Sequence, residues 1–289
     1  MGAVTRFLFP AVPRARVARL RALLCAFVWL DVLVLTTWIA PHGDVPGDLY
    51  QPLAIGRLLP LPTPTGVLVD VVRAGLLVAA AVAATGRLPR LAGAAVAVLY
   101  LEWMVVAMSY GKVDHDRFAF LVALAVLPTV GRAGWRDRTT DERAGWALRC
   151  IQLAVVATYF LAVVAKHRYG GGLLTWLDST TLLRAVVRRG TWLADWTTDV
   201  PWVLHAYQYV LVAFELGSPA LLLPGRVGRL YLAAAAAFHA VTFATIRIGF
   251  WPHTVCLAAF LPLERLSWSS LRAGDLRPGK VLVGPDVAR

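Results

Sequence analysis

The sequence predicts an all-α protein, a polytopic membrane helix bundle with about eight transmembrane helices. Hydrophobic residues make up 58% of the 289 positions and charged residues only 16%, whereas soluble domains carry about 25% charged residues. Apolar segments recur at the length that a helix needs to cross a bilayer, about 20 residues. Arginines gather between alternate segments, as they do in cytoplasmic loops. This pattern excludes a disordered chain, a nucleic-acid-binding domain, a disulfide scaffold and an ordinary soluble enzyme.

The first expected span covers residues 20–40 and follows a basic N-terminal segment. Its apolar run is too long for the hydrophobic region of a signal peptide, so we expect a retained anchor. The second to eighth spans are expected at 67–86, 92–111, 117–130, 147–166, 202–223, 230–249 and 250–264. The fourth (117–130) and the eighth (250–264) are shorter than a bilayer normally requires.

Charge sets the expected orientation. If 117–130 crosses the bilayer, the arginine clusters on either side of it and those at both chain ends face one compartment, the cytoplasm. Nearly all the basic residues are arginine, a bias typical of high-GC bacterial genomes. We therefore expect a multi-pass protein of the bacterial plasma membrane. Residues 1–19 form a cytoplasmic N-terminus, 20–265 the transmembrane domain and 266–289 a cytoplasmic tail.

The segment 173–199 differs from the spans because it is rich in tryptophan and has arginines between its tryptophans. Tryptophan favours the headgroup layer, and arginines at i and i+4, such as Arg184 and Arg188, suit an amphipathic helix lying in that layer. The segment is either such an interfacial belt, with no role toward a substrate, or a re-entrant element that roofs a cavity between the helices.

Four ionisable residues fall in the middle of four different spans: Asp31, Glu102, Glu215 and His239. Placing a charge at the centre of a bilayer is costly, so each of these side chains is expected to face the protein interior. They either line a substrate cavity or form the hydrogen bonds that hold the helices together. The pattern leaves both interpretations open.

A second group lies at the outer ends of the spans. His115 precedes the fourth span, and Lys166 ends the fifth on the same side. A lysine at the lip of a hydrophobic cavity loses solvation and can act as a base, whereas a span-ending lysine more commonly reaches out to the headgroups. We expect a cavity with Lys166 and His115 at its outer mouth and His239 deeper on its wall, with Thr242 and Ile246 between them.

Four stretches resemble the HTTM family, which shares its membrane part with the vitamin K-dependent gamma-carboxylases. The run Tyr159–Lys166, followed by Trp176, is similar to the family signature Y-F-x-(A/S)-G-x-x-K…W. The stretches His115–Arg132, Glu215–Pro219 and Phe238–Pro252 are similar to further segments of the family in the same order. Together they span roughly residues 15–265.

The resemblance implies a quinone chemistry. In the carboxylases the lysine matching Lys166 is the proposed base that deprotonates vitamin K hydroquinone, and the histidine matching His115 assists it. Reaction with oxygen then yields a strong base that removes the γ proton of a glutamate, so that CO2 can add. The resemblance thus implies a reduced quinone of the vitamin K or menaquinol type, no metal, and a site facing outward. The expected partners are the lipid bilayer and a secreted peptide, with no nucleic acid.

The sequence also departs from the family pattern. His167 stands where the family has a leucine after the lysine. The large lumenal domain of the carboxylases is expected to be absent. We therefore expect either a quinol-dependent oxidase or peptide-modifying enzyme, or a non-catalytic membrane partner in the maturation, export or immunity of a secreted peptide. A transporter built on the mid-span charges is less favoured because no inverted repeat is visible.

Overall fold

The computed structural model describes residues 2–111 and 113–266, so nearly all of the expected C-terminal tail lies outside the described residues. The described chain is mainly helical, and one small antiparallel sheet within it pairs β1 (Val12–Pro13) with β2 (Thr140–Asp141). The α-helices are α1 (Ala3–Leu8), α2 (Arg14–Leu30), α3 (Ala54–Leu58), α4 (Gly66–Thr85), α5 (Leu91–Met108), α6 (Phe118–Val130), α7 (Glu142–Tyr169), α8 (Leu173–Leu177), α9 (Thr181–Arg189), α10 (Pro201–Leu216), α11 (Arg226–Ile246) and α12 (Trp251–Cys256).

Four helices in the described part of the chain are long and apolar enough to cross a membrane: α4, α5, α7 and α11. A fifth span results if α2, its π-helical extension and the 3₁₀ segment Thr37–Asp44 count as one element, although the two halves are bent by 62°. The structure therefore confirms a helical protein with several membrane-length apolar helices. It supports four or five such helices and does not support eight.

The three remaining expected spans are short because proline and glycine interrupt them. Segment 117–130 is the 13-residue helix α6, which ends at Gly131 with φ of 75°. Segment 202–223 divides into α10, with 16 residues, and a 3₁₀ turn over Ser218–Leu222 that contains Pro219. Segment 250–264 divides into the six residues of α12 and two 3₁₀ turns around Pro262. Proline cannot donate the backbone hydrogen bond that would continue a helix. A span assigned from the length of an apolar segment alone does not take this interruption into account.

The bend in the first span has a local cause. Residues Asp31–Leu35 form a π-helical turn, in which the Thr36 amide donates to the Asp31 carbonyl at 2.7 Å. The Thr36 hydroxyl donates to the same carbonyl at 2.8 Å. Side chains that insert into the backbone ladder kink helices in this way. The turn places Asp31 inside the bundle, where it is fully buried.

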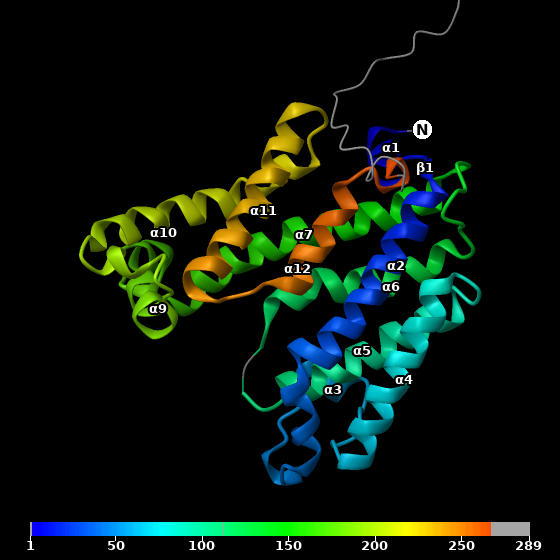
Figure 1. Cartoon of the computed structure of the whole chain (residues 1–289), viewed down its shortest axis with the longest axis horizontal. Coiled ribbons are helices and arrows are strands. Elements are labelled where there is room, and N and C mark those ends of the chain that lie inside the picture. The colour runs from blue at the N-terminus through cyan, green and yellow to red at the C-terminus, as the bar shows by residue number, and fades with distance from the viewer. Residues whose placement is uncertain (1, 112, 267–289) are drawn as a thin grey trace, which may run out of the picture.

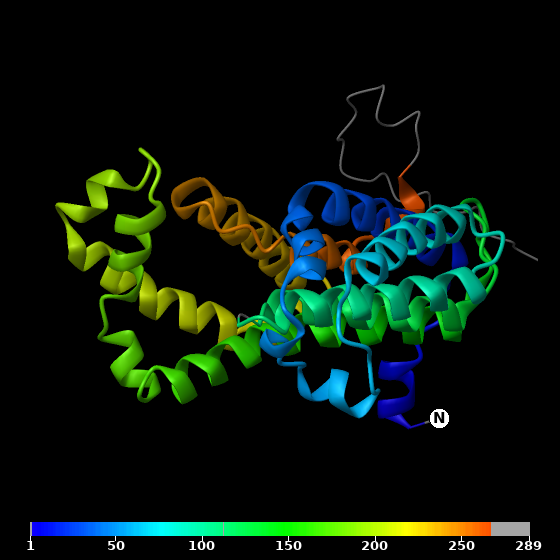
Figure 2. The ribbon, with the colours of Figure 1, turned by 90° about the horizontal axis from the view of Figure 1, so that it is seen from below.

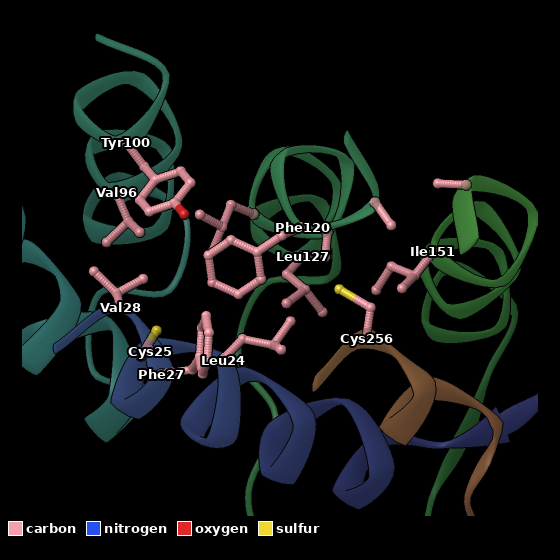
Figure 3. Close-up of a cluster of buried hydrophobic side chains, with 14 of the residues drawn as sticks. Leu24, Cys25, Phe27, Val28, Val96, Tyr100, Phe120, Leu127, Ile151 and Cys256 are labelled. Carbon is pink, nitrogen blue, oxygen red and sulfur yellow. The ribbon is translucent and has the colours of Figure 1, made fainter. Parts of the chain in front are cut away.

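The main core lies between α2, α4, α5, α6, α7 and α12. Figure 3 shows Leu24 and Phe27 of α2 directed toward Phe120 and Leu127 of α6. The rings of Phe27 and Phe120 meet edge to face with their centroids 5.2 Å apart, a favoured arrangement for aromatic pairs. This core fixes the N-terminal half of α7, and therefore the direction in which the rest of α7 extends.

The C-terminal half of α7 leaves this core and reaches a second group of helices, α8 to α11 (Figures 1 and 2). Two small apolar clusters hold this group together, one around Val163, Leu177 and Val212 and the other around Val186, Ala194 and Leu204. The segment 173–199 is thus a series of short helices. Helix α9 is amphipathic, with Val186 buried and Arg188 and Arg189 exposed.

Candidate functional site

A cavity of about 440 Å³ lies where the second half of α7 meets α9, α10, α11 and α12. Most of its wall is apolar, formed by side chains such as Leu182, Val186, Leu211 and Ile246. Its volume is in the range of small-molecule sites, which are mainly apolar with a few placed polar groups. Two sets of polar side chains in this wall contact one another.

The first set is centred on Lys166 of α7. Its Nζ donates to both carboxylate oxygens of Glu215 on α10, at 2.7 Å each. The side chains of Lys166 and Glu215 are only 16% and 7% exposed. The Lys166 ammonium also lies over the ring of Trp176, 5.2 Å from its centroid, which is within the range of a cation–π contact. Lys166 is therefore held inside the protein by an anion and an aromatic face.

The second set surrounds Tyr159, two turns earlier on α7. The Tyr159 hydroxyl and His239 Nε2 share a hydrogen bond of 2.9 Å. His253 of α12 lies beside both, with its ring centroid 4.6 Å from that of Tyr159 and 5.3 Å from that of His239. His239 and His253 are 7% and 2% exposed. The side chains of Tyr159, His239 and His253, each of which can donate or accept a hydrogen bond, thus meet on one wall of the cavity.

His115 also lines the cavity, and its ring centroid is 6.2 Å from that of Phe250. It begins the 3₁₀ turn His115–Arg117 that leads into α6. Arg117 anchors this turn, because its guanidinium donates to Asp31 Oδ2 at 2.6 Å and to the Tyr100 hydroxyl at 2.7 Å. The Asp31–Arg117 pair therefore fixes the start of α6 and the backbone that carries His115.

A second hollow adjoins the first and shares His115 and Lys166 with it. Trp176, Tyr169 and Arg184 lie on its wall. The structure thus places Lys166, His115, His239 and Glu215 around one cavity and Trp176 beside it. Thr242 and Ile246, expected along the path to His239, line the same cavity.

Asp31 and Glu102 lie outside this cavity. Asp31 belongs to the buried network with Arg117 and Tyr100, so its role is the one expected of an interhelical bond. Glu102 of α5 is 7% exposed, and neither of its carboxylate oxygens has a hydrogen-bond partner in the described part of the chain. Of the four mid-span charges, only Glu215 and His239 therefore line the cavity.

Two residues of the site were not singled out from the sequence as cavity residues, Tyr159 and His253. Tyr159 carries a signal that would have found it, because it precedes Lys166 by seven residues and so lies on the same face of the helix. For His253 the sequence showed only that it lies at the outer end of the eighth expected span, on the same side as His115 and Lys166. Its position beside His239 depends on the turn between α11 and α12, where Arg247 adopts a left-handed conformation with φ of 54°.

Comparison with models of protein families, with curated proteins and with solved structures finds no match for this chain.

Proposed function

We propose that this chain is an HTTM-type integral membrane protein that binds a reduced quinone in the cavity and accepts a proton from it through Lys166 and Glu215. The observation that carries the proposal is the Lys166–Glu215 pair, with both contacts at 2.7 Å, in the wall of an otherwise apolar cavity. Ionisable groups placed in an apolar pocket are typical of acid–base sites.

The residues present fit a reduced quinone. The apolar wall suits a substituted ring and the start of an isoprenoid chain, and the cavity volume of about 440 Å³ is adequate for such a ring. The wall also carries polar side chains, among them Lys166, Glu215 and His115, which the oxygen atoms of such a ring need as partners.

A quinol supplies acidic hydroxyl groups and, on oxidation by O2, reducing equivalents. The task of this chain is to remove a hydroxyl proton. In the ion pair Lys166 is already an ammonium, so we assign the first acceptance of the proton to the carboxylate of Glu215. The ammonium of Lys166 then stabilises the oxyanion that is left. To His115, which lines the same cavity, we assign the onward transfer of the proton.

The experiment is quinol epoxidation by the purified protein, with vitamin K hydroquinone and menaquinol as substrates. Wild type is expected to form the epoxide, and Lys166→Ala to lose at least about a hundredfold in rate, as expected for an acid–base group. Arg168→Ala is the matched control, because Arg168 is an exposed cation two residues further along the chain. Absence of epoxide from wild type with both quinols would overturn the catalytic proposal.

A second candidate, a non-catalytic membrane partner of a secreted peptide, is favoured by the same ion pair. A lysine bound to a carboxylate has no lone pair with which to act as a base. On this proposal the Lys166–Glu215 pair joins α7 to α10 and nothing more. Wild type would then form no epoxide, and a gene for a small secreted peptide would lie beside the gene for this chain.

We also propose a topology in which the shorter helices α6, α10 and α12 complete eight crossings of a bacterial plasma membrane, with both termini in the cytoplasm. Support comes from α6, which packs between α5 and α7 and joins them by short connections, so that the three alternate in direction. A reporter fused after residue 266 that is active only outside the cytoplasm would contradict this topology.

A further inference from the structure

A hollow of about 440 Å³, separate from the cavity around Lys166, lies where the turn between α4 and α5 meets the segment that follows α6. Arg87, Arg90 and Arg132 line this arginine hollow. All three arginines are exposed, and none forms an ion pair among the described residues. Within residues 2–111 and 113–266 no acidic side chain lines the hollow. Its wall therefore carries positive charge that no neighbouring carboxylate offsets.

A fourth arginine fixes the backbone around the arginine hollow. Arg21 of α2 is 3% exposed, and its guanidinium donates to the carbonyl of Gly131 at 3.2 Å and to that of Ala133 at 3.1 Å. The same guanidinium packs against Gly86, where an added Cβ would lie 2.6 Å from Nη2. Arg21 thus joins the turn after α4 to the segment after α6, which lie side by side in Figure 2. The arginine hollow is therefore held by the core of the bundle.

The start of α5 adds further positive charge at the same place. The Arg90 guanidinium lies against Gly131, where an added Cβ would be 3.4 Å from both Nε and Nη2. Leu91, the first residue of the 18-residue helix α5, also lines the hollow, and the N-terminus of a helix carries a partial positive charge. Guanidinium groups donate well to the oxygen atoms of a phosphate. The arginine hollow is thus suited to an anion of this type.

The arginine hollow also has an apolar side. Leu88 and Leu91 line it, and both side chains are largely exposed. Leu88 lies in the turn that joins α4 to α5, two helices that are long and apolar enough to cross a membrane. Guanidinium groups and exposed leucines therefore meet at the ends of membrane-length helices. Basic pockets between membrane helices bind the headgroups of anionic lipids.

We infer that the arginine hollow binds an anionic phospholipid, with its phosphate on Arg87, Arg90 and Arg132 and its acyl chains along the two exposed leucines. A free phosphate offers the same oxygen atoms but gains nothing from the leucines. The inference is independent of the proposed function, because no residue lines both the arginine hollow and the cavity around Lys166.

The test is native mass spectrometry of the purified full chain in detergent, titrated with two phospholipids that share dioleoyl chains. Phosphatidylglycerol has a net negative headgroup, whereas the choline of phosphatidylcholine neutralises its phosphate. Wild type is expected to bind the first phosphatidylglycerol about tenfold more tightly than phosphatidylcholine. The triple variant Arg87→Gln, Arg90→Gln and Arg132→Gln should reduce this preference to less than about twofold. Its affinity for phosphatidylcholine should not change.

A second triple variant separates a site from general surface charge. Arg136→Gln, Arg138→Gln and Arg143→Gln remove three exposed arginines that do not line the hollow, so this control should keep the tenfold preference. An equal loss of preference in the control would show that surface charge alone attracts the lipid. Equal affinity of wild type for the two lipids would show that there is no anion site. Either result overturns the inference.

Two further measurements complete the test. If the triple variant of the hollow does not fold, as judged by its elution profile, Arg132→Gln alone should lower the preference about threefold, and an unchanged preference would contradict the inference. Millimolar glycerol phosphate should leave phosphatidylglycerol bound, because the soluble anion lacks acyl chains. Displacement of the lipid by glycerol phosphate would assign the hollow to soluble phosphates and overturn the assignment to a lipid.

Discussion

Lys166 and Glu215 lie 49 positions apart in the chain, yet Lys166 Nζ is within 2.7 Å of both carboxylate oxygens of Glu215. The pair joins α7 to α10 at the point where α7 has left the main core. Both side chains are largely buried, so each charge depends on the other for the solvation that it has lost.

Breaking this pair is expected to destabilise the protein. Glu215→Leu leaves an unpaired ammonium inside the protein and should cost about 3–5 kcal/mol, whereas Lys166→Met combined with Glu215→Leu should recover most of that loss. Thermal unfolding in detergent measures both effects. The double variant should nevertheless be inactive in epoxidation. If it retained activity, the pair would have no chemical role.

The Asp31–Arg117 pair gives a prediction about His115. Arg117→Met leaves the fully buried Asp31 without its cation, so a loss of stability of about 3–5 kcal/mol is expected. Asp31→Asn should be milder, because an amide can still accept from the Tyr100 hydroxyl. Both variants should loosen the turn that carries His115, which proteolysis or hydrogen exchange at residues 113–118 can detect. Unchanged exchange there would show that the pair does not position His115.

Gly145 marks the closest approach of the N-terminal segment to α7. A Cβ at this position would lie 1.5 Å from the carbonyl oxygen of Pro10, so the backbone must move if a side chain is added. Gly145→Ala is therefore expected to lower the unfolding temperature and to displace the segment that contains β1. Gly134→Ala is the matched control, since the nearest atom to its Cβ is 3.9 Å away. Equal unfolding temperatures of the two variants would contradict this packing.

The Arg16–Glu264 pair ties the first helix to the last described residues and predicts a pH dependence. Hydrogen bonds from the Arg16 guanidinium, at 2.6 and 2.7 Å, hold the pKa of Glu264 below its ordinary value of 4.5. A carboxyl with a depressed pKa in the folded state contributes stability that is complete above its unfolded pKa. That contribution is lost as the pH falls from about 4.5 through the folded pKa.

Unfolding temperatures measured from about pH 6 to about pH 3 test this sign. Wild type should lose more stability over that range than Glu264→Gln, which cannot titrate. Asp195→Asn, a change at an exposed carboxyl, should follow wild type. A steeper acid loss in Glu264→Gln than in wild type would reverse the assignment.

Much of the candidate site was predicted from the sequence. The positions of Glu215 and His239 within apolar segments indicated that these two side chains face the interior. For Lys166 the sequence left open a cavity or the headgroups, and Lys166 and His115 were expected together at the outer mouth of a cavity. This argument needs only the local sequence, because a charge within an apolar helix must avoid lipid whichever other helices it packs against. The set of residues expected to line the cavity lacked Tyr159 and His253. It also included Asp31 and Glu102, which lie outside the cavity.

By itself the sequence determined that this is a helical protein with membrane-length apolar segments, since hydropathy and helix length are properties of contiguous residues. The number of membrane-length helices depended on where proline and glycine end a helix, as at Pro219 and Gly131. Which charges meet was decided only by the tertiary structure. The rotation of each helix and the bend at Thr36 direct Asp31 to Arg117, and Glu215 pairs with Lys166. Such orientations arise from packing between segments that are distant in the chain.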